Sequence, residues 1–189
     1  MPLPTRKHLD TIGDVHGQAG KLERFLRVLG YAKIGGVYGL AGRKAVFVGD
    51  LIDRGPAIGE TLEIVKAMVD AGNAICAMGN HELNALAFHT PDGNGSYIRQ
   101  HTKKNIRQHA RTLEFFASRP GAQQHYLNWF WSLPLWLDFQ GLRVVHAAWD
   151  QGMIDWLFTP ALTPQRLALT ASRSSEEFRC LDGLLRVSK

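Results

Sequence analysis

Short apolar runs alternate along the first half of the chain with segments whose apolar residues recur at helical spacing. The runs HLDTI (8–12), AVFV (45–48) and AICAM (74–78) each stop at a glycine. After each run the apolar positions change to the i, i+3, i+4 spacing of an amphipathic helix. These positions are Leu22, Phe25, Leu26 and Leu29, then Ile58, Leu62, Val65, Met68 and Val69, then the segment 81–88. Three such units predict an α/β fold with a mostly parallel, buried sheet.

The second half of the chain has a different pattern. Residues 96–131 lack strand alternation and are predicted to be helical. LWLDF (135–139) and LRVVH (142–146) flank the dipeptide Gln140-Gly141, which predicts a hairpin whose second strand delivers His146 to its carboxyl end. The segment beyond His146 is predicted to be helical. No repeat or linker divides the chain, so residues 1–189 are expected to form a single domain.

Polar residues follow each of the three predicted parallel strands. The motifs are GDVHG (13–17), GDLIDRG (49–55) and GNHE (79–82). The carboxyl ends of neighbouring strands in an open α/β sheet converge on one crevice, so these loops are expected to meet. Asp14 and His16 can bind one ion, and a carboxylate from the next strand can bridge to a second.

The three motifs, in this order and at strand ends, resemble those of the calcineurin-like metallophosphoesterases, and especially of their protein-phosphatase (PPP-type) branch. VVHAAWD (144–150) resembles the strand-end histidine segment that follows them in that family, so the resemblance covers about residues 8–150. It implies an α/β/β/α sandwich with a mostly parallel sheet and a helical insertion at about 96–131.

The resemblance also implies a dinuclear metal site. Asp14 and His16 would bind the first ion, Asp50 would bridge both ions, and Asn80 and His146 would bind the second. Mixed oxygen and imidazole ligands suit two divalent ions, with manganese expected and iron or zinc as alternatives. In this family a hydroxide shared by the ions attacks phosphorus in line with the leaving oxygen.

Three further residues gain catalytic roles from the same resemblance. Arg54 would hold phosphate oxygens, His81 would donate a proton to the leaving oxygen, and Asp53 would orient His81. Taken singly these residues have plainer interpretations, since Arg54 can be a surface cation and His81 a helix cap. Glu82 is expected to have a supporting or structural role. The histidines that match no motif are expected to be ordinary surface or core residues: His8, His89, His101, His109 and His125.

One ligand of the family pattern is absent. The pattern ends with another histidine after a late strand, and no histidine follows His146. We expect the chain to be a C-terminally truncated form with an incomplete C-terminal sheet. The alternative is a natural short form in which Asp150, Asp155 or water replaces the ligand. In either case the first ion is expected to bind more tightly than the second.

The leading functional prediction is hydrolysis of phosphomonoesters, as in serine/threonine phosphatases, with a phosphorylated protein or small molecule as substrate. The alternative within enzymes is hydrolysis of dinucleoside polyphosphates, and nuclease activity is a weaker one. A different class is a catalytically impaired module that binds metal or phosphate.

Composition and charge bear on the expected partners and on the expected cellular location. The net charge of +5 over 189 residues favours a phosphate-bearing partner. Many of the cations lie between residues 97 and 119, where a solvated helix face is the plainer interpretation, and nucleic acid is not an expected partner. The two cysteines indicate no disulfide framework. No apolar run reaches the roughly 18 residues of a membrane span and no secretory leader is visible, so the expected location is the cytoplasm.

Overall fold

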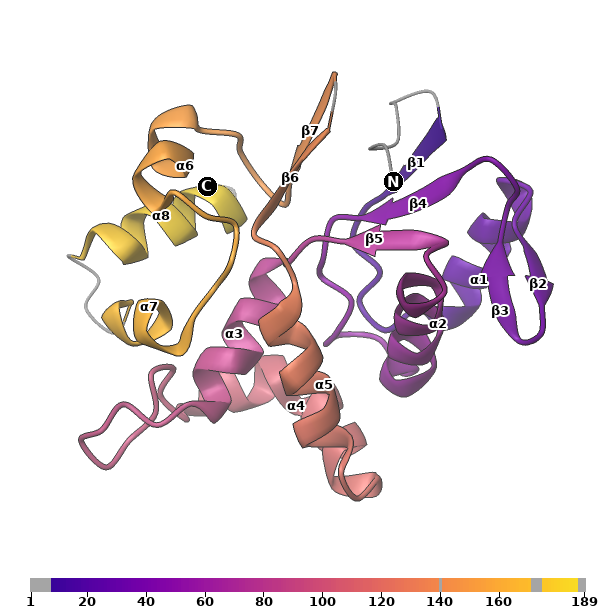
Figure 1. Cartoon of the computed structure of the whole chain (residues 1–189). Helices are drawn as coiled ribbons and strands as arrows, with labels where there is room; N and C mark the ends of the chain where they lie inside the picture. Colours follow the sequence, from indigo (N-terminus) through magenta and orange to yellow (C-terminus); the bar gives the residue numbers. More distant parts are fainter. Residues whose placement is uncertain (1–7, 140, 171–174, 187–189) are drawn as a thin grey trace.

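Three strands form a parallel sheet in the order β1-β4-β5, in the upper right part of Figure 1. The computed structural model describes residues 8–139, 141–170 and 175–186. The three strands are β1 (Leu9–Ile12), β4 (Lys44–Phe47) and β5 (Ala74–Cys76). All three predicted strands and their parallel pairing are confirmed.

Helices cover one face of this sheet. The helix α1 (Ala19–Val28) follows β1, α2 (Ile58–Asp70) follows β4, and α3 (Asn80–His89) follows β5. The apolar stripe of α2 packs in the main core cluster together with Phe47 of β4, and its residues Leu62, Val65 and Met68 are fully buried. The sequence spacing that predicted α2 therefore marks the face that the structure buries, whereas Phe25 on the predicted apolar face of α1 is 45% exposed.

A hairpin covers the other face of the sheet. The strands β6 (Trp136–Phe139) and β7 (Leu142–Val145) pair antiparallel, as predicted, although Gln140 of the predicted turn lies outside the described residues. Val46 of β4 packs with the hairpin in a second apolar cluster, whereas its neighbour Phe47 belongs to the main core. Because successive strand residues point to opposite faces, β4 is buried on both sides.

The remaining helices lie below the sheet and on the left-hand side of Figure 1. The predicted helical segment 96–131 contains two helices, of which the first begins only at Lys103, and the prediction for the chain beyond His146 is confirmed by three more. The structure places α4 at Lys103–Ser118, α5 at Ala122–Ser132, α6 at Gln151–Leu157, α7 at Pro164–Leu169 and α8 at Glu176–Leu185. Leu184 and Leu185 of α8 are fully buried, so α8 is packed into the core.

One element was not predicted from the sequence. The strands β2 (Ala32–Ile34) and β3 (Val37–Gly39) form a small antiparallel hairpin. Its turn is Gly35-Gly36, with φ angles of 59° and 87°, which is the backbone that a two-residue hairpin loop requires. All residues of β2 are exposed, so no apolar pattern marks the strand.

Cys76 and Cys180 are buried free thiols, which confirms that they form no disulfide. Among the helices that the structure describes, none has the length and apolarity required to cross a lipid bilayer.

Candidate metal centre

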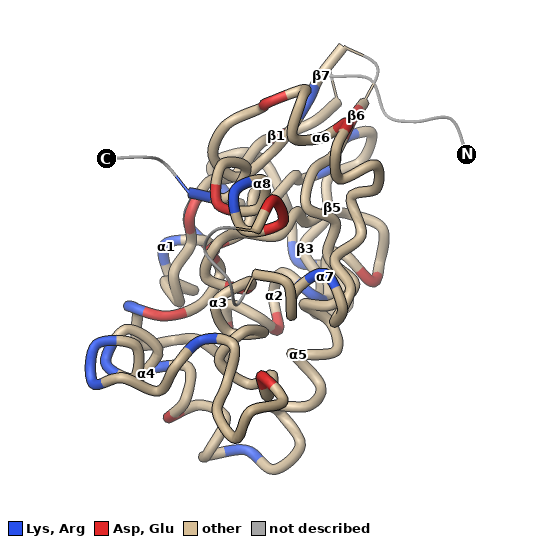
Figure 2. The backbone as a smooth tube through the Cα atoms, turned by 90° about the vertical axis from the view of Figure 1, so that its left-hand side faces the viewer, with Lys and Arg blue, Asp and Glu red and all other residues tan. Residues whose placement is uncertain are grey.

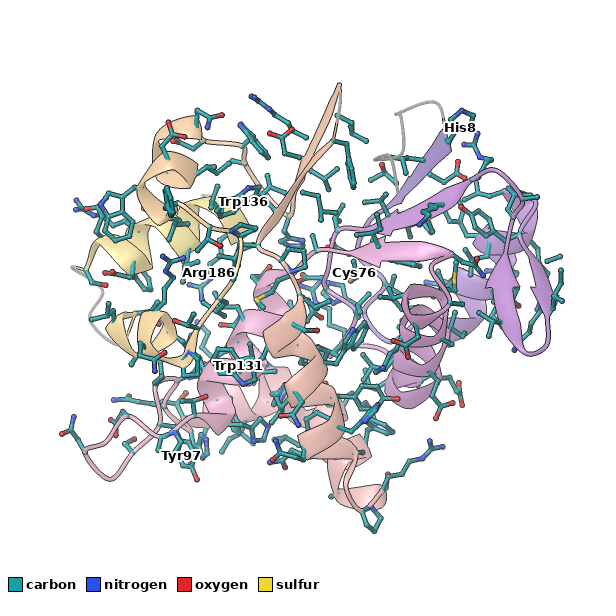
Figure 3. The ribbon with its side chains drawn as sticks, in the orientation of Figure 1. His8, Cys76, Tyr97, Trp131, Trp136 and Arg186 are labelled. Carbon is teal, nitrogen blue, oxygen red and sulfur yellow. The ribbon has the colours of Figure 1, made fainter. Side chains whose placement is uncertain are left out.

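The polar residues predicted as a site follow three strands that end at the same level. Ile12 of β1 pairs with Phe47 of β4, and Phe47 pairs with Cys76 of β5. Cys76, labelled in Figure 3, marks the end of β5 beside the centre of the molecule. The three loops therefore begin side by side at one edge of the sheet.

Two glycines allow these loops to touch. A Cβ atom on Gly49 would lie 2.1 Å from the backbone nitrogen of Gly79, and one on Gly79 would lie 2.3 Å from that of Asp50. Gly49 also has a φ of 92°, which L residues rarely adopt. Any larger residue at either position would separate the loops that carry Asp50 and Asn80.

Left-handed backbone is concentrated in the same loops. Four of the five described non-glycine residues with positive φ lie there, at His16 (46°), Asp50 (54°), Asp53 (66°) and Arg54 (56°). Such conformations are retained where the surrounding structure enforces them, and they are typical of functional sites. The backbone N–H of His16 donates to the carbonyl of Asp50 at 2.8 Å, which ties the first loop to the second.

The carboxylate of Glu82 joins the second and third loops. It is fully buried and accepts hydrogen bonds from the backbone nitrogens of Asp50 (2.8 Å), Leu51 (2.9 Å) and Gly79 (3.0 Å). Burial, and then the negative charge of Asp50, raise the pKa of Glu82 to about 7. The structural role expected for Glu82 agrees with this position.

We expect Glu82→Ala to destabilise the metal-free protein strongly. Three buried N–H groups would lose their acceptor, and each unpaired group costs about 1 to 3 kcal/mol. The free energy of unfolding, measured in urea, should therefore fall by at least about 3 kcal/mol. Glu60→Ala on the exposed start of α2 is the matched control, and an equal, small change in both variants would contradict the role of Glu82.

All five residues predicted as metal ligands lie together. Nε2 of His16 is 3.5 Å from Oδ2 of Asp14 and 3.6 Å from Oδ2 of Asp50. Nε2 of His146 is 3.5 Å from the same Asp50 oxygen and 3.1 Å from Oδ1 of Asn80. Asp50, which is only 2% exposed, thus stands between the two halves of the cluster.

Both imidazoles are held by a hydrogen bond from Nδ1 to a backbone carbonyl. Nδ1 of His16 donates to the carbonyl of Ile52 at 3.0 Å, and Nδ1 of His146 donates to that of Val48 at 2.8 Å. With the hydrogen on Nδ1, a neutral ring turns the lone pair of Nε2 toward the carboxylates. Nε2 of His16 is buried without a hydrogen-bond partner. A cation in the crevice would give this nitrogen of His16 a partner.

The spacing of the ligand atoms fits a shared ion. Two ligand atoms about 2.1 Å from one metal and separated by a tetrahedral angle lie roughly 3.4 Å apart. The distances around Asp50 are close to this value. Two sets have ligand atoms within 4.8 Å of one another, Asp14 with Asp50 and His146, and His16 with Asp50 and His81. Both sets share Asp50 and mix oxygen with nitrogen ligands, although they group the histidines differently from the predicted assignment.

The crevice favours positive charge. Burial opposes protonation of His146, but its hydrogen bond to Asp50 and the charge of that carboxylate outweigh it and raise the pKa of His146 to about 9. Without a metal ion, the carboxylates hold a proton at the position where a cation would sit.

His81 and Asp53 form a hydrogen-bonded pair beside the cluster. Nδ1 of His81 donates to Oδ2 of Asp53 at 2.6 Å, and its Nε2 lies 3.8 Å from Oδ2 of Asp50. Burial opposes protonation of His81, yet the bond to Asp53 and the charge of Asp50 raise its pKa above the ordinary value. A protonated His81 therefore presents an N–H to the crevice.

The sequence prediction missed two partners of Asp53. Its Oδ1 accepts from Oγ1 of Thr112 at 2.6 Å and from Nδ1 of His109 at 2.8 Å. Burial opposes ionisation of Asp53, but these bonds and that from His81 hold its pKa well below the ordinary value. His109 was expected to be an ordinary histidine, and this was incomplete. Its spacing of three residues from Thr112, on one face of α4, is the only signal that the sequence carries.

Asp150 and Asp155, considered as substitute ligands, are engaged in α6. Asp150 caps this helix by accepting from the backbone nitrogen of Met153 at 2.9 Å. Asp155 accepts from the side chain of Gln151 at 2.7 Å. Neither belongs to the metal-ligand sets found among the described residues.

Two cavities flank the cluster and share Arg54, whose side chain is exposed. The first, of about 440 Å³, is lined by Asp14 and His16 among others. The second, of about 720 Å³, is lined by Asn80 and His81 among others. The cluster therefore lies where two hollows meet.

The chain is similar in sequence to a known family and to two groups of enzymes. The sequence model described as calcineurin-like phosphoesterase matches residues 8–163. The chain is 30% identical over 140 residues to a bis(5'-nucleosyl)-tetraphosphatase PrpE [asymmetrical] of Oceanobacillus iheyensis, covering 74% of the chain and 54% of the relative. It is 32% identical over 133 residues to a symmetrical bis(5'-nucleosyl)-tetraphosphatase of Aromatoleum aromaticum, covering 69% and 42%. The chain thus spans about half the length of these relatives.

A solved structure shows the same fold. A cold-active protein tyrosine phosphatase superposes with a TM-score of 0.61 at 20% sequence identity, covering 95% of this chain and 55% of that one.

Proposed function

The chain belongs to the calcineurin-like phosphoesterase family, and from this premise we propose that it is a metal-dependent phosphohydrolase. The observation that supports the proposal best is the convergence of Asp14, His16, Asn80 and His146 on the buried carboxylate of Asp50. Such a donor set suits two divalent ions, for which we keep manganese as the expected metal and iron or zinc as alternatives.

These five residues would hold the ions, with Asp50 shared between them. When bound, the ions supply Lewis-acid activation of water and neutralise the charge of the phosphate. The carbonyls that hold His16 and His146 by Nδ1 keep both Nε2 atoms directed into the crevice. The site is thus preorganised before any metal or substrate arrives.

His81 is proposed as the proton donor. Asp53 fixes the ring through Nδ1, and His109 and Thr112 keep Asp53 ionised and in place. The proton on Nε2 of His81 can then pass to the oxygen that leaves phosphorus. Arg54, exposed where the two cavities meet, can hold two oxygens of the transferred phosphoryl group with its planar guanidinium.

We infer that the substrate is a dinucleoside polyphosphate. Two observations favour it over the phosphomonoesters that the motifs first indicated. The two relatives reported above are tetraphosphatases, and the cluster lies between two cavities, which suits a substrate that extends on both sides of the scissile bond. Hydrolysis of phosphomonoesters or phosphoproteins stays a prediction, and so does the cytoplasmic location.

A panel of substrates tests the proposed function. The manganese-loaded chain is expected to hydrolyse diadenosine tetraphosphate with a higher kcat/KM than p-nitrophenyl phosphate or a phosphoserine peptide. The reverse order would restore the phosphomonoester prediction. Stoichiometric metal binding with no hydrolysis of any of the three would instead support the catalytically impaired module.

A further inference from the structure

The larger cavity beside the cluster has a strongly positive wall. Its volume is about 720 Å³, and it extends from His81 and Arg54 along α3 and α4 to the buried side of α8. We call it the basic cavity. Its cationic side chains are Arg54, Arg99, Lys104 and Arg186. Figure 2 shows basic residues gathered around the start of α4, the helix that contributes Lys104.

The two carboxylates that line the basic cavity are each bound to other side chains of the protein. Asp53 is bound by His81, His109 and Thr112. Asp182 lies 2.7 Å from Nη1 of Arg186 and forms an ion pair with it. The cavity therefore carries an excess of positive charge that its own acids do not balance.

Arg99 has a setting that is unusual for an arginine. Its guanidinium is partly buried and donates to Oε1 of Gln108 at 2.7 Å and to Oδ1 of Asn105 at 3.3 Å. Both acceptors are neutral amides. Within the described chain, no carboxylate oxygen lies within 4.0 Å of the Arg99 guanidinium. Burial, and then the proximity of Arg186, lower the pKa of Arg99 from its ordinary value.

Arg186 is held in place from a different direction. Its Nη2 donates to Oδ1 of Asn84 on α3 at 3.1 Å, so it crosses from the end of α8 to α3. The label in Figure 3 shows Arg186 between these helices. Arg186 keeps its ion pair with Asp182, whereas Arg99 has only amide partners, so an anion bound near both guanidiniums would offset the repulsion that Arg99 experiences from Arg186.

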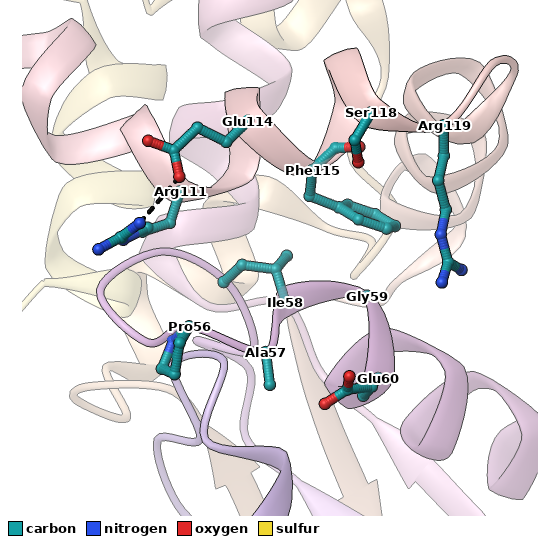
Figure 4. A pocket seen from close by; sticks show the side chains of 10 residues that line it. All are labelled: Pro56, Ala57, Ile58, Gly59, Glu60, Arg111, Glu114, Phe115, Ser118 and Arg119. Atoms are coloured by element: carbon teal, nitrogen blue, oxygen red, sulfur yellow. Dashed lines mark hydrogen bonds and ion pairs between the residues drawn. The ribbon is translucent and has the colours of Figure 1, made fainter.

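Two arginines that line a second cavity have carboxylate partners. This cavity lies between the start of α2 and α4, has a volume of about 350 Å³ and is shown in Figure 4. Its Arg111 pairs with Glu114 at 2.9 Å, and its Arg119 pairs with Glu63. There each cation has its own carboxylate. Arg99, which is partly buried, has no such carboxylate among the described residues.

We propose that Arg99 and Arg186, with Lys104, form an anion subsite that binds the phosphates of a polyphosphate chain beyond the scissile bond. The proposal rests on the proposed function, because the subsite shares its cavity with His81 and Arg54. Guanidiniums bind phosphate oxygens through paired hydrogen bonds, and several phosphates in a row can satisfy several cations at once. The subsite would select substrates that carry a phosphate chain over simple monoesters.

Kinetics of Arg99→Met and Arg186→Met test the subsite. Each is expected to raise KM for diadenosine tetraphosphate by about 10- to 100-fold, the range expected for lost hydrogen bonds between charged groups. KM and kcat for p-nitrophenyl phosphate, which has a single phosphate, should stay within about twofold. Arg107→Met, at an exposed position on α4 and outside the cavity, is the control for the loss of one charge. Equal losses with both substrates, or no loss with either, would overturn the proposal.

A binding measurement separates this proposal from the proposed function. Calorimetric titration of the metal-free chain with inorganic tripolyphosphate should show binding that Arg99→Met weakens about tenfold or more and Arg107→Met does not. If hydrolysis is absent but this difference is found, the subsite stands and the proposed function fails. If hydrolysis occurs and both variants bind tripolyphosphate like the original chain, the subsite fails alone. Arg99→Lys, which keeps the charge and loses the planar fork, should bind with intermediate affinity.

Discussion

Asp50→Asn is expected to lower kcat/KM for diadenosine tetraphosphate by more than about 100-fold, since even a lost outer partner of a metal ligand typically costs 10- to 100-fold. The substitution keeps the shape of the side chain and removes the charge on which both halves of the cluster depend. Oδ2 of Asp50 lies 3.6 Å from the Nε2 atom of His16, 3.8 Å from that of His81 and 3.5 Å from that of His146. Manganese binding, measured by calorimetry, should fall below two ions per chain.

Asp138→Asn is the matched control for this experiment. Asp138 is an exposed carboxylate on β6 that lies 3.5 Å from Arg143, far along the hairpin from the cluster. It should leave both kcat/KM and the metal stoichiometry unchanged. Hydrolysis by Asp50→Asn at the original rate, with full metal binding, would show that this carboxylate does not bridge ions.

His81→Asn is expected to lower kcat far more for a poor leaving group than for a good one. Proton donation by a positioned histidine contributes about 10²- to 10⁴-fold, and this contribution is needed most when the leaving oxygen is basic. Phenyl phosphate, whose leaving group resembles a tyrosine side chain with a pKa of about 10, should lose this full factor. The more acidic leaving group of p-nitrophenyl phosphate should show a smaller loss, and KM should change little for both.

The control for the second experiment is His125→Asn. This histidine lies on the exposed side of α5 and has no contact with the cluster among the described residues. A loss of equal size with both aryl phosphates would mean that His81 binds substrate and does not donate a proton.

The main sheet and the position of the loops at its edge were predictable because the apolar runs in the sequence coincide with the strands that pair in the structure. Each strand is a short apolar run that ends at a glycine, and the parallel register brings the polar residues that follow to one edge. Asp14, His16, Asp50 and Asn80 follow these strands, whereas His146 follows β7, and their expected roles as ligands came from the resemblance to the family. The glycines carry this information, since Gly49 and Gly79 must lack side chains for their loops to meet.

Other features left no comparable signal. The strand β2 is exposed along its length, so its apolar pattern does not distinguish it from a loop. His109 and Thr112 reach Asp53 across 56 and 59 residues of sequence, and only the packing of α4 brings them there. The cations of the segment 97–119 were interpreted as a solvated face. This holds for Arg111, which is paired at the surface, but not for Arg99, whose partners are amides within the basic cavity.

The central claim is that two ions bind on either side of the Asp50 carboxylate. Anomalous diffraction from crystals grown with manganese measures this most directly. The structure predicts two anomalous peaks, each about 2.1 Å from an oxygen of Asp50 and from the Nε2 atom of a histidine ligand, with His16 on one ion and His146 on the other. A single peak, or peaks that lie away from Asp50, would contradict the account.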